Sequence, residues 1–249
     1  DPVKITGKTV HFAREIDSTN LWGKRAWKEE GAKHGELFVA EYQSAGRGRF
    51  TRRWSAPPDS AITMSILICP KFSPMKAPMM TLVMGLSVAQ AVADLGLDVG
   101  IKWPNDVLLG EKKVCGILTE AVTDFESGNI EFAVVGIGLN IFEAADGYPD
   151  SLKGIAGGIY ENREAAGELD RSRLAAEIVN ALLEETRELR LPQEYIEHNL
   201  VPGREICISD GDKIRRAKAL EICPDGRLKV EEADGSLSVL SYGEVSIII

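Results

Sequence analysis

The segment Ile130–Asn140, IEFAVVGIGLN, is an almost unbroken apolar run, and it limits the folds open to this chain. A run without alternation is typical of a strand covered on both faces, because a half-exposed strand alternates apolar and polar residues. Helices are needed to cover such a strand. Met79–Leu95 repeats apolar residues at the i, i+3, i+4 and i+7 spacing, and Arg171–Leu189 is amphipathic, with Asp170 as its expected N-cap. The sequence therefore predicts an α/β domain.

Other segments of the first two hundred residues are expected to add strands and helices to this core. Strands are expected at Lys8–Arg14, Glu36–Tyr42, Ala61–Cys69 and Val99–Trp103, and a hairpin at Val107–Leu109 and Val114–Ala121 across Gly110–Lys113. A helix is expected at Leu21–Glu29 after the capping residues Asp17-Ser-Thr-Asn20, and a shorter one at Pro192–Asn199.

The sequence pattern changes after Pro202-Gly203, where short strand segments alternate with turns. Short strands are expected at Ile206–Ser209, Ala217–Cys223, Leu228–Glu232 and Ser236–Leu240. They are separated by Asp210-Gly211, Asp225-Gly226 and Asp234-Gly235, which are strong turn signals. Turns at this spacing predict a small β-barrel. We therefore divide the chain into residues 1–199 and a C-terminal β domain of residues 200–249.

The overall charge and composition restrict the partners of this chain. The formal net charge is −9, whereas a general nucleic-acid-binding protein needs a broad basic face. We expect no apolar run long enough to span a bilayer, and the N-terminus lacks the pattern of a signal peptide. The four cysteines form no C-x-x-C pair and the three histidines are scattered, which does not favour a zinc site. Free thiols of a cytoplasmic protein are the expectation.

Within this acidic chain, the loop from residue 45 to 54, AGRGRFTRRW, concentrates positive charge at Arg47, Arg49, Arg52 and Arg53. Guanidinium groups match the geometry of carboxylates and phosphates, and interleaved glycines let backbone N–H groups approach a ligand. The loop therefore predicts a site for more than one anion. A solvated basic loop is the simpler alternative. The chain contains no Walker A motif.

A second polar segment, Lys102-Trp-Pro-Asn-Asp106, follows an expected apolar strand. Strand ends are common places for ligand contacts in α/β folds. Asp106 with Asn105 is a candidate for holding Mg²⁺ or for orienting a reacting group. A simple Pro-Asn-Asp turn is the alternative.

Two further segments combine glycine with strand patterns. Lys113 lies near Gly116, and a glycine inside a strand often marks the close approach of a ligand or another backbone. The alternative is that Lys113 is an ordinary solvent-exposed lysine at a turn. Gly136-Ile-Gly138 lacks the third glycine of a dinucleotide fingerprint. It favours a flat ligand against the backbone and does not favour a Rossmann fold.

Together these segments supply the groups needed to join two anions. The set is Arg47, Arg49, Arg52, Lys102 and Lys113, with Asn105 and Asp106. A carboxylate and a triphosphate repel each other, so their reaction needs positive charge placed in advance. The predicted reaction is adenylation of a carboxylate at the α-phosphorus of ATP, with pyrophosphate leaving on Mg²⁺.

Six segments, in this order, resemble the successive signatures of the biotin–protein ligases, or biotin–[acetyl-CoA-carboxylase] ligases. They are Asp17-Ser-Thr-Asn20, Ala40-Glu-Tyr-Gln43, Gly46-Arg-Gly-Arg with Arg52-Arg-Trp54, Lys102-Trp-Pro-Asn-Asp106, Lys113-Val-Cys-Gly-Ile-Leu-Thr-Glu120 and Gly136-Ile-Gly-Leu-Asn140. The resemblance covers essentially the whole chain. It implies an α/β (α+β) fold with a class II synthetase-like core, in which helices pack on a mixed sheet, and a small C-terminal SH3-like β-barrel.

The resemblance also implies a two-step reaction. Biotin and ATP give biotinoyl-5′-AMP and pyrophosphate, and the biotinoyl group then passes to one lysine of a biotin carboxyl carrier protein. By resemblance, biotin is bound by Ser18, Thr19, Asn20, Gln43, Gly46, Arg47, Gly48, Arg49, Lys113 and Gly116. ATP is bound by Arg49, Arg52, Trp54, Lys102, Asn105, Asp106, Lys113 and Asn140. The implied catalytic residues are Arg49, Lys113 and Asp106, and Asp106 is the implied Mg²⁺ ligand.

Two positions depart from the family pattern. Thr51 stands where the family usually has glycine, which leaves the path of the loop open. Cys115 stands where a small residue is usual, and cysteine is small enough to pack there. Some members of the family carry an N-terminal DNA-binding domain. Here the strand that leads to Asp17 begins almost at residue 1, so we expect no DNA binding by this chain. Because the family often dimerises, a homodimer is a further expectation.

Three alternatives differ from this interpretation in testable ways. An acyl ligase for lipoate or octanoate shares the core fold but lacks the paired Gly-Arg-Gly-Arg and Lys-Trp-Pro-Asn-Asp motifs. A non-catalytic biotin sensor would keep Ser18, Thr19 and Gln43 without the charged residues. A nucleic-acid-binding protein conflicts with the net charge of −9 and with the lack of an aromatic stacking surface.

Overall fold

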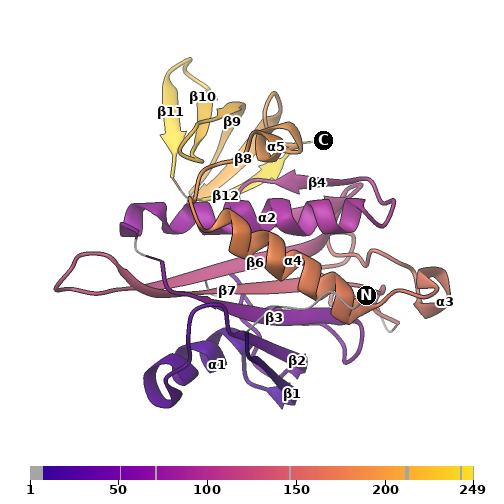
Figure 1. Cartoon of the computed structure of the whole chain (residues 1–249). Helices are drawn as coiled ribbons and strands as arrows, with labels where there is room; N and C mark the ends of the chain where they lie inside the picture. The colour runs from indigo at the N-terminus through magenta and orange to yellow at the C-terminus, as the bar shows by residue number, and fades with distance from the viewer. Residues whose placement is uncertain are drawn as a thin grey trace.

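The computed structural model describes residues 8–50, 52–70, 72–145, 147–210, 213–241 and 243–248. These residues form a seven-stranded sheet with helices on both faces and a separate five-stranded sheet (Figure 1). The two sheets account for the mixed α/β architecture that the sequence predicts.

The large sheet has the spatial order β1-β2-β3-β7-β6-β5-β4. Its strands are β1 Val10–Ile16, β2 Leu37–Gln43, β3 Ala61–Ile68, β4 Val99–Lys102, β5 Asp106–Leu109, β6 Lys112–Thr123 and β7 Ile130–Asn140. β1 and β2 are parallel, and all other neighbours are antiparallel, so the sheet is mixed. Every strand predicted for this part of the chain is present, with ends that shift slightly.

β7 lies in the middle of the sheet, between β3 and β6. All of its residues are buried except Glu131, which confirms the prediction of a strand covered on both faces. On one face lies α1 (Thr19–Arg25), which continues as a short π-helical turn, Ala26–Glu30. On the other face lie α2 (Ala77–Ala93) and α4 (Arg171–Glu185), which pack on each other (Figure 1).

The remaining helical segments are short. They are a 3₁₀ turn at Pro74–Lys76, α3 at Arg163–Ala166 and α5 at Gln193–Glu197. α5 confirms the expected short helix, whereas α3 was not predicted. Asp170 caps α4 as expected, because its carboxylate accepts the N–H groups of Ser172 and Arg173.

The start of α1 differs from the prediction. Ser18 is the N-cap residue, but its side chain makes no capping hydrogen bond. The carboxylate of Asp17 instead accepts two hydrogen bonds from Arg25, at 2.7 and 2.8 Å. Gln43 of β2 caps the helix from a distant strand, because its Oε1 accepts the Thr19 N–H at 2.7 Å. The predicted position of the N-cap, within Asp17–Asn20, is therefore confirmed, but the capping hydrogen bond comes from Gln43 and not from these side chains.

α2 is buried on more sides than an amphipathic stripe predicts, because the sheet, α4 and the C-terminal sheet surround it. By length and composition, Pro74–Ala93 is a helix that is able to cross a membrane, so the expectation that no run is long enough was wrong. However, 67% of its apolar window is buried inside the protein, as in any helix that forms part of a core.

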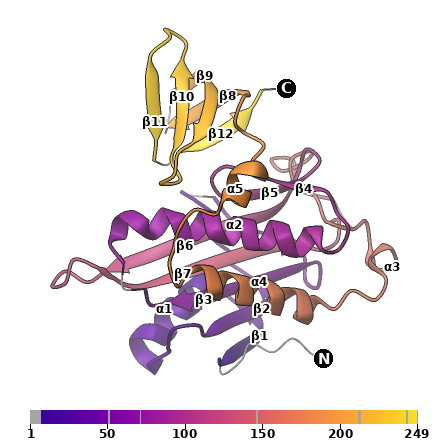
Figure 2. The same cartoon turned by 45° about the horizontal axis from the view of Figure 1, so that its top comes forward.

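The C-terminal sheet is antiparallel, in the order β11-β10-β9-β8-β12. Its strands are β8 Glu205–Asp210, β9 Lys213–Ile222, β10 Leu228–Glu232, β11 Leu237–Leu240 and β12 Glu244–Ile247. β11 and β12 do not pair within the described residues, so the sheet is open, whereas a closed barrel was predicted. β12 was not predicted at all. Figure 2 places this sheet beyond α5 and β4. The domain division at residue 200 stays a prediction.

One buried hydrogen bond joins the two sheets. Trp103 is only 2% exposed, and its Nε1 donates to the carbonyl oxygen of Gly226 at 2.9 Å. Gly226 has a φ of +84°, and a Cβ there would lie 2.3 Å from Leu82 of α2. Glycine is therefore needed at this turn both for its backbone conformation and for the close approach of α2.

Trp103→Phe is expected to lower the free energy of unfolding by about 2–3 kcal/mol, because it leaves a void and removes the donor to a buried carbonyl. Urea denaturation measures this change. The matched control is Trp27→Phe, since the Nε1 of Trp27 donates to Glu131 at an exposed position where water replaces it. The control is expected to lose less than about 1 kcal/mol. Equal losses in the two variants would contradict a special role for the Trp103 contact.

Candidate active site

The two faces of the central strands differ in chemistry. The face toward α2 carries aliphatic core residues, Met64 and Ile66 of β3 and Ile137 and Leu139 of β7. Because side chains alternate across a strand, the face toward α1 carries the residues between them. These are Thr63 and Ser65 of β3 and Gly136 and Gly138 of β7. The α1 face therefore combines small polar side chains with glycine backbone, on which side chains from other segments are able to lie.

Thr19, Asn20, Gln43, Ser65 and Glu120, which we call the polar cluster, meet on this face. Thr19 Oγ1 donates to Gln43 Oε1 at 3.1 Å. The Ser65 hydroxyl lies 2.7 Å from Thr19 Oγ1 and 2.6 Å from Asn20 Oδ1. Asn20 Nδ2 donates to Glu120 Oε2 at 2.9 Å. Thr19, Asn20 and Ser65 are buried, and Gln43 and Glu120 are partly buried. The cluster joins α1 to three strands, so it suits an uncharged polar ligand group.

Glu120 links the polar cluster to nearby positive charge. Its Oε1 lies 2.7 Å from Lys24 Nζ and 3.2 Å from Arg47 Nη2. Burial opposes ionisation of Glu120, but hydrogen bonds from Lys24 and Asn20 outweigh it, and the pKa of the carboxyl lies below its usual value. Glu120 therefore stays ionised and holds the first arginine of the loop against the sheet.

Glycines form the floor between this cluster and the loop. A Cβ at Gly136 would lie 2.1 Å from Asn20 Oδ1, and a Cβ at Gly138 would lie 2.1 Å from the ring of Trp54. Gly116 of β6 faces the same ring and Lys113. The ring of Trp54 therefore lies against bare backbone at Gly138 and Gly116, and the predicted approach of a ligand to these strands stays a prediction.

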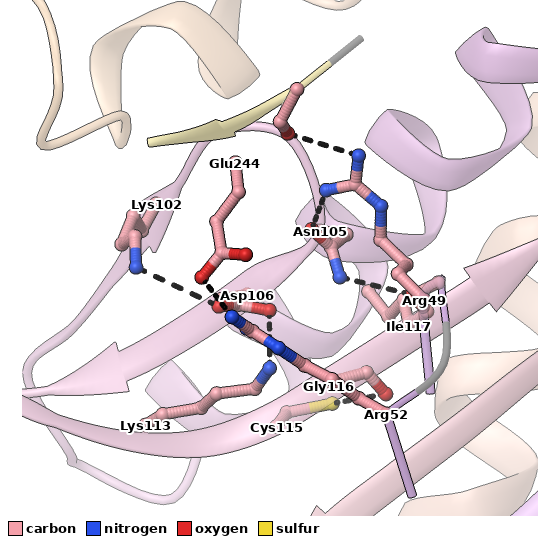
Figure 3. A network of polar contacts seen from close by, with 11 residues as sticks. Arg49, Arg52, Lys102, Asn105, Asp106, Lys113, Cys115, Gly116, Ile117 and Glu244 are labelled. Atoms are coloured by element: carbon pink, nitrogen blue, oxygen red, sulfur yellow. Dashed lines mark hydrogen bonds and ion pairs between the residues drawn. The ribbon is translucent and has the colours of Figure 1, made fainter. Parts of the chain in front are cut away.

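Arg49, Arg52, Lys102, Asn105, Asp106 and Lys113 form a second group, the cation cluster (Figure 3). Lys113 Nζ lies 2.6 Å from Asp106 Oδ1, and Lys102 Nζ lies 3.9 Å from Asp106 Oδ2. The contact with Lys113 is an ion pair, because Asp106 Oδ1 accepts no well-directed hydrogen bond. Arg49 Nη1 donates to Asn105 Oδ1 at 2.8 Å. Lys102 and Lys113 thus flank the carboxylate of Asp106, and Arg49 is held beside them by Asn105.

Two of these cations are partly removed from water. Burial lowers the pKa of Lys102, and the neighbouring Asp106 opposes this shift. Burial also lowers the pKa of Arg49, and the carboxylate of Asp106 again opposes this shift. A desolvated cation interacts more strongly with an anion than an exposed one does. The cluster is therefore suited to hold phosphate or carboxylate oxygens.

The arginine loop folds back on itself as a tight hairpin. Gly48 N donates to Arg52 O at 2.9 Å, and Trp54 N donates to Gly46 O at 3.0 Å. A Cβ at Gly46 would lie 2.4 Å from the carbonyl oxygen of Trp54. Glycine at this position therefore serves the loop's own backbone, and not only a ligand as the sequence suggested. Thr51 lies outside the described residues.

Some predicted residues are not part of either cluster. Asn140 Nδ2 donates to Gly157 O at 3.0 Å, so its side chain supports the segment after β7. The side chain of Ser18 is buried, but it is not among the hydrogen-bonding groups of the polar cluster. The nucleotide and biotin roles of these two residues stay predictions.

Sequence reasoning missed four residues that contact the site. Ser65 and Glu120 belong to the polar cluster, and Gly243 and Glu244 reach the cation cluster from the C-terminal sheet. The sequence contained one signal for Ser65. It is a polar residue two positions after Thr63 in an apolar strand, so the two side chains lie on the same face. The other contacts join distant segments and have no local signal.

The described residues contain no group of three or more His, Cys, Asp or Glu side chains that is able to hold a metal ion. A groove of about 540 Å³ lies elsewhere, lined by residues that include Lys8, His34, Cys69 and Arg187. It shares no residue with either cluster.

Comparison with known proteins agrees with this geometry. Residues 12–140 match the sequence model of the Biotin/lipoate A/B protein ligase family. This chain is also 31% identical to the Bifunctional ligase/repressor BirA of Bacillus subtilis, over 97% of this chain and 71% of that protein. The chain belongs to the biotin/lipoate A/B protein ligase family.

Two more members of the family extend the comparison. The Biotin–[acetyl-CoA-carboxylase] ligase of Mycobacterium tuberculosis is 31% identical over 85% of this chain and 78% of that protein. The structure of a biotin protein ligase from Aquifex aeolicus in complex with biotin and ATP superposes with a TM-score of 0.76, at 25% identity, over 96% of this chain and 98% of that chain. The likeness includes the C-terminal sheet.

Glu120→Gln tests whether this carboxylate stabilises the site as an ion. Because folding lowers its pKa, the carboxylate contributes stability above the unfolded pKa and loses it as the pH falls through the folded pKa. The variant is expected to lose about 1–3 kcal/mol of unfolding free energy at pH 7, and its difference from wild type is expected to shrink as the pH falls below the usual pKa of a glutamate. Urea denaturation at several pH values measures this.

The control for this experiment is Glu177→Gln, which removes an exposed ion pair with Arg173 on α4. This control is expected to lower the free energy of unfolding by less than about 0.5 kcal/mol at any pH. If the loss caused by Glu120→Gln did not change with pH, the side chain would be acting through packing and not through its charge.

Proposed function

We propose that this chain is a biotin protein ligase whose polar cluster and cation cluster form a single site. It joins biotin to ATP to give biotinoyl-5′-AMP and pyrophosphate, and then transfers the biotinoyl group to a lysine of a biotin carboxyl carrier protein. The observation that carries the proposal is the placement of the two clusters side by side on one sheet face. One offers the polar side chains of Thr19, Asn20, Gln43 and Ser65 beside the ion-paired Glu120, the other is cationic, and Trp54 over the glycine floor lies between them.

In the first step, a carboxylate oxygen of biotin attacks the α-phosphorus of ATP. A bond forms between this oxygen and phosphorus, and the bond from phosphorus to the β-bridging oxygen breaks. Lys113 and Arg49 neutralise the charge that the two anions bring together, which is the main barrier to their approach. Thr19, Asn20 and Gln43 hold the uncharged polar head of biotin, and Arg52 and Lys102 bind the phosphates.

In the second step, the ε-amine of the acceptor lysine attacks the carbonyl carbon of the mixed anhydride. The bond from this carbon to the phosphate oxygen breaks, and AMP leaves. Asp106 accepts the proton that the amine loses. Its carboxylate is only 14% exposed and is aimed into the cluster, so it is placed for this role.

Mg²⁺ fits the residues around Asp106. Mg²⁺ is usually held by one or two carboxylates together with substrate phosphates, and Asp106 supplies such a carboxylate, with Oδ1 paired to Lys113 and Oδ2 3.9 Å from Lys102 Nζ. When bound, the ion supplies charge neutralisation to the departing pyrophosphate. Asp106 would hold it, with Asn105 beside it.

We also propose an acceptor, a location and an oligomeric state for this enzyme. The acceptor is a carrier protein of acetyl-CoA carboxylase or a related carboxylase, and the location is the cytoplasm, which suits the four free cysteines. A homodimer follows from the resemblance to the family, and sedimentation equilibrium measures it.

The reaction is tested by pyrophosphate release with Mg²⁺ and ATP, with biotin, lipoate or octanoate offered separately. Release with biotin alone is expected, followed by transfer to a lysine of a carrier domain. Release with lipoate or octanoate would assign the chain to the other branch of the family. Biotin binding without release would indicate a sensor.

Lys113→Ala is expected to reduce adenylate formation on the order of 100-fold, because it removes a charge from the place where two anions meet. Single-turnover pyrophosphate release measures the rate. The matched control is Lys112→Ala, since the neighbouring Lys112 is half-exposed and pairs with Glu143 away from the cluster. Similar rates in both variants, with unchanged thermal stability, would remove Lys113 from the site.

A further inference from the structure

The carboxylate of Glu120 has different neighbours at its two oxygens. Oε2 accepts a hydrogen bond from Asn20 Nδ2 at 2.9 Å. Oε1 lies 2.7 Å from Lys24 Nζ and 3.2 Å from Arg47 Nη2. The side chain is only 16% exposed, so these contacts are partly shielded from water. Because Glu120 stays ionised, it accepts hydrogen bonds and donates none.

The side-chain amide of Asn20 has one orientation that satisfies its neighbours. Its Nδ2 faces Glu120 Oε2 and, at 3.3 Å, the carbonyl oxygen of Leu118, and neither of these groups is able to donate. The nitrogen therefore lies on this side, and Oδ1 points the other way, toward the Ser65 hydroxyl at 2.6 Å. Asn20 and Ser65 are both buried, so the amide is removed from bulk water. Glu120 thus makes Asn20 an acceptor toward Ser65.

The two hydroxyl groups next to Asn20 are one proton short. Ser65 Oγ lies 2.6 Å from Asn20 Oδ1 and 2.7 Å from Thr19 Oγ1, and Thr19 Oγ1 lies 3.1 Å from Gln43 Oε1. Gln43 Oε1 also accepts the backbone N–H of Thr19, which fixes the orientation of that amide as well. Both ends of this chain are thus acceptors, and each hydroxyl carries one proton. Three contacts therefore share two protons, and one contact lacks its proton whichever way the hydroxyls point.

We infer that Glu120 is a positioning residue that determines ligand specificity, because by fixing the amide of Asn20 it leaves the polar cluster in need of a hydrogen-bond donor. The ligand group that the cluster selects therefore carries an N–H. This inference rests on the proposed function, since the cyclic urea of biotin offers N–H donors, whereas lipoate and octanoate offer none at the corresponding end. Glu120 acts on the ligand through Asn20.

The test compares biotin with an analogue in which oxygen replaces both ureido N–H groups, a cyclic carbonate of nearly the same shape. Isothermal titration calorimetry with the full chain measures both dissociation constants. Wild type is expected to bind biotin on the order of 100-fold more tightly than the carbonate, because a buried acceptor left without its donor is costly.

Glu120→Gln is expected to lower this preference for biotin roughly 10-fold. Lys24 and Arg47 attract the oxygen of the introduced amide, so its NH₂ group turns toward Asn20 and favours the flipped orientation of that side chain. The flipped Asn20 then donates to Ser65 and supplies the missing proton. The cluster no longer needs a donor from the ligand.

Asn20→Ala is a second variant that does not depend on the folding of Glu120→Gln. It removes one acceptor, so two protons serve two contacts, and the preference for biotin is again expected to fall about 10-fold. The double variant is expected to show no further fall beyond Asn20→Ala, since Glu120 acts through Asn20. Glu177→Gln, on α4 at the other face of the sheet, is the control and is expected to keep the wild-type preference.

The ratio of the two affinities separates specificity from a general structural role. An unchanged ratio in Glu120→Gln, or an equal loss of affinity for both ligands, would overturn the inference, because a structural defect weakens both alike. Equal binding of the two ligands by wild type would also overturn it, since a cluster that lacks a proton discriminates between them. If wild type bound neither ligand, the proposed function itself would fail, and this inference with it.

Discussion

The structure depends on a constraint at its centre, where β3 and β7 must be fully packed on one face and nearly bare on the other. The aliphatic residues toward α2 bury enough apolar surface to hold these strands in place. This packing makes two glycines in β7 tolerable, although glycine weakens a strand. Asn20 and Trp54 then lie directly on the backbone at Gly136 and Gly138. The ligand-binding face is thus a product of the core on the opposite face.

Electrostatic balance at the site is local, although the chain as a whole carries a net charge of −9. Three carboxylates meet the concentrated cations, and each comes from a different strand. Asp106 begins β5, Glu120 lies in β6, and Glu244 begins β12. Each pairs with lysine or arginine in partly buried surroundings, where an unpaired charge would be costly. The cations are therefore held apart and in place by the protein's own anions.

Local signals predicted most of the fold, and long-range contacts account for what they missed. The apolar run of β7, the Asp170 cap and the hairpin at Gly110 all depend on neighbours in sequence, and the structure contains them. The motifs also brought the arginines, Lys102, Asp106 and Lys113 together. The Gln43 cap, β12 and the contact of Glu244 with Arg52 depend on pairing between distant segments, which no local pattern specifies. The contact of Trp103 with Gly226, which anchors the second sheet, is likewise not specified by any local pattern.

The separation of the polar cluster along the chain has a kinetic consequence. Asn20 and Glu120 are 100 residues apart, and β3 reaches its partner β7 only after a long intervening segment has closed. Closing such loops is entropically slow compared with forming the β6–β7 hairpin, which joins strands that are adjacent in the sequence. The hairpin is thus expected to form early, and the ligand-binding face late. Recovery of biotin binding during refolding would consequently lag behind recovery of the sheet.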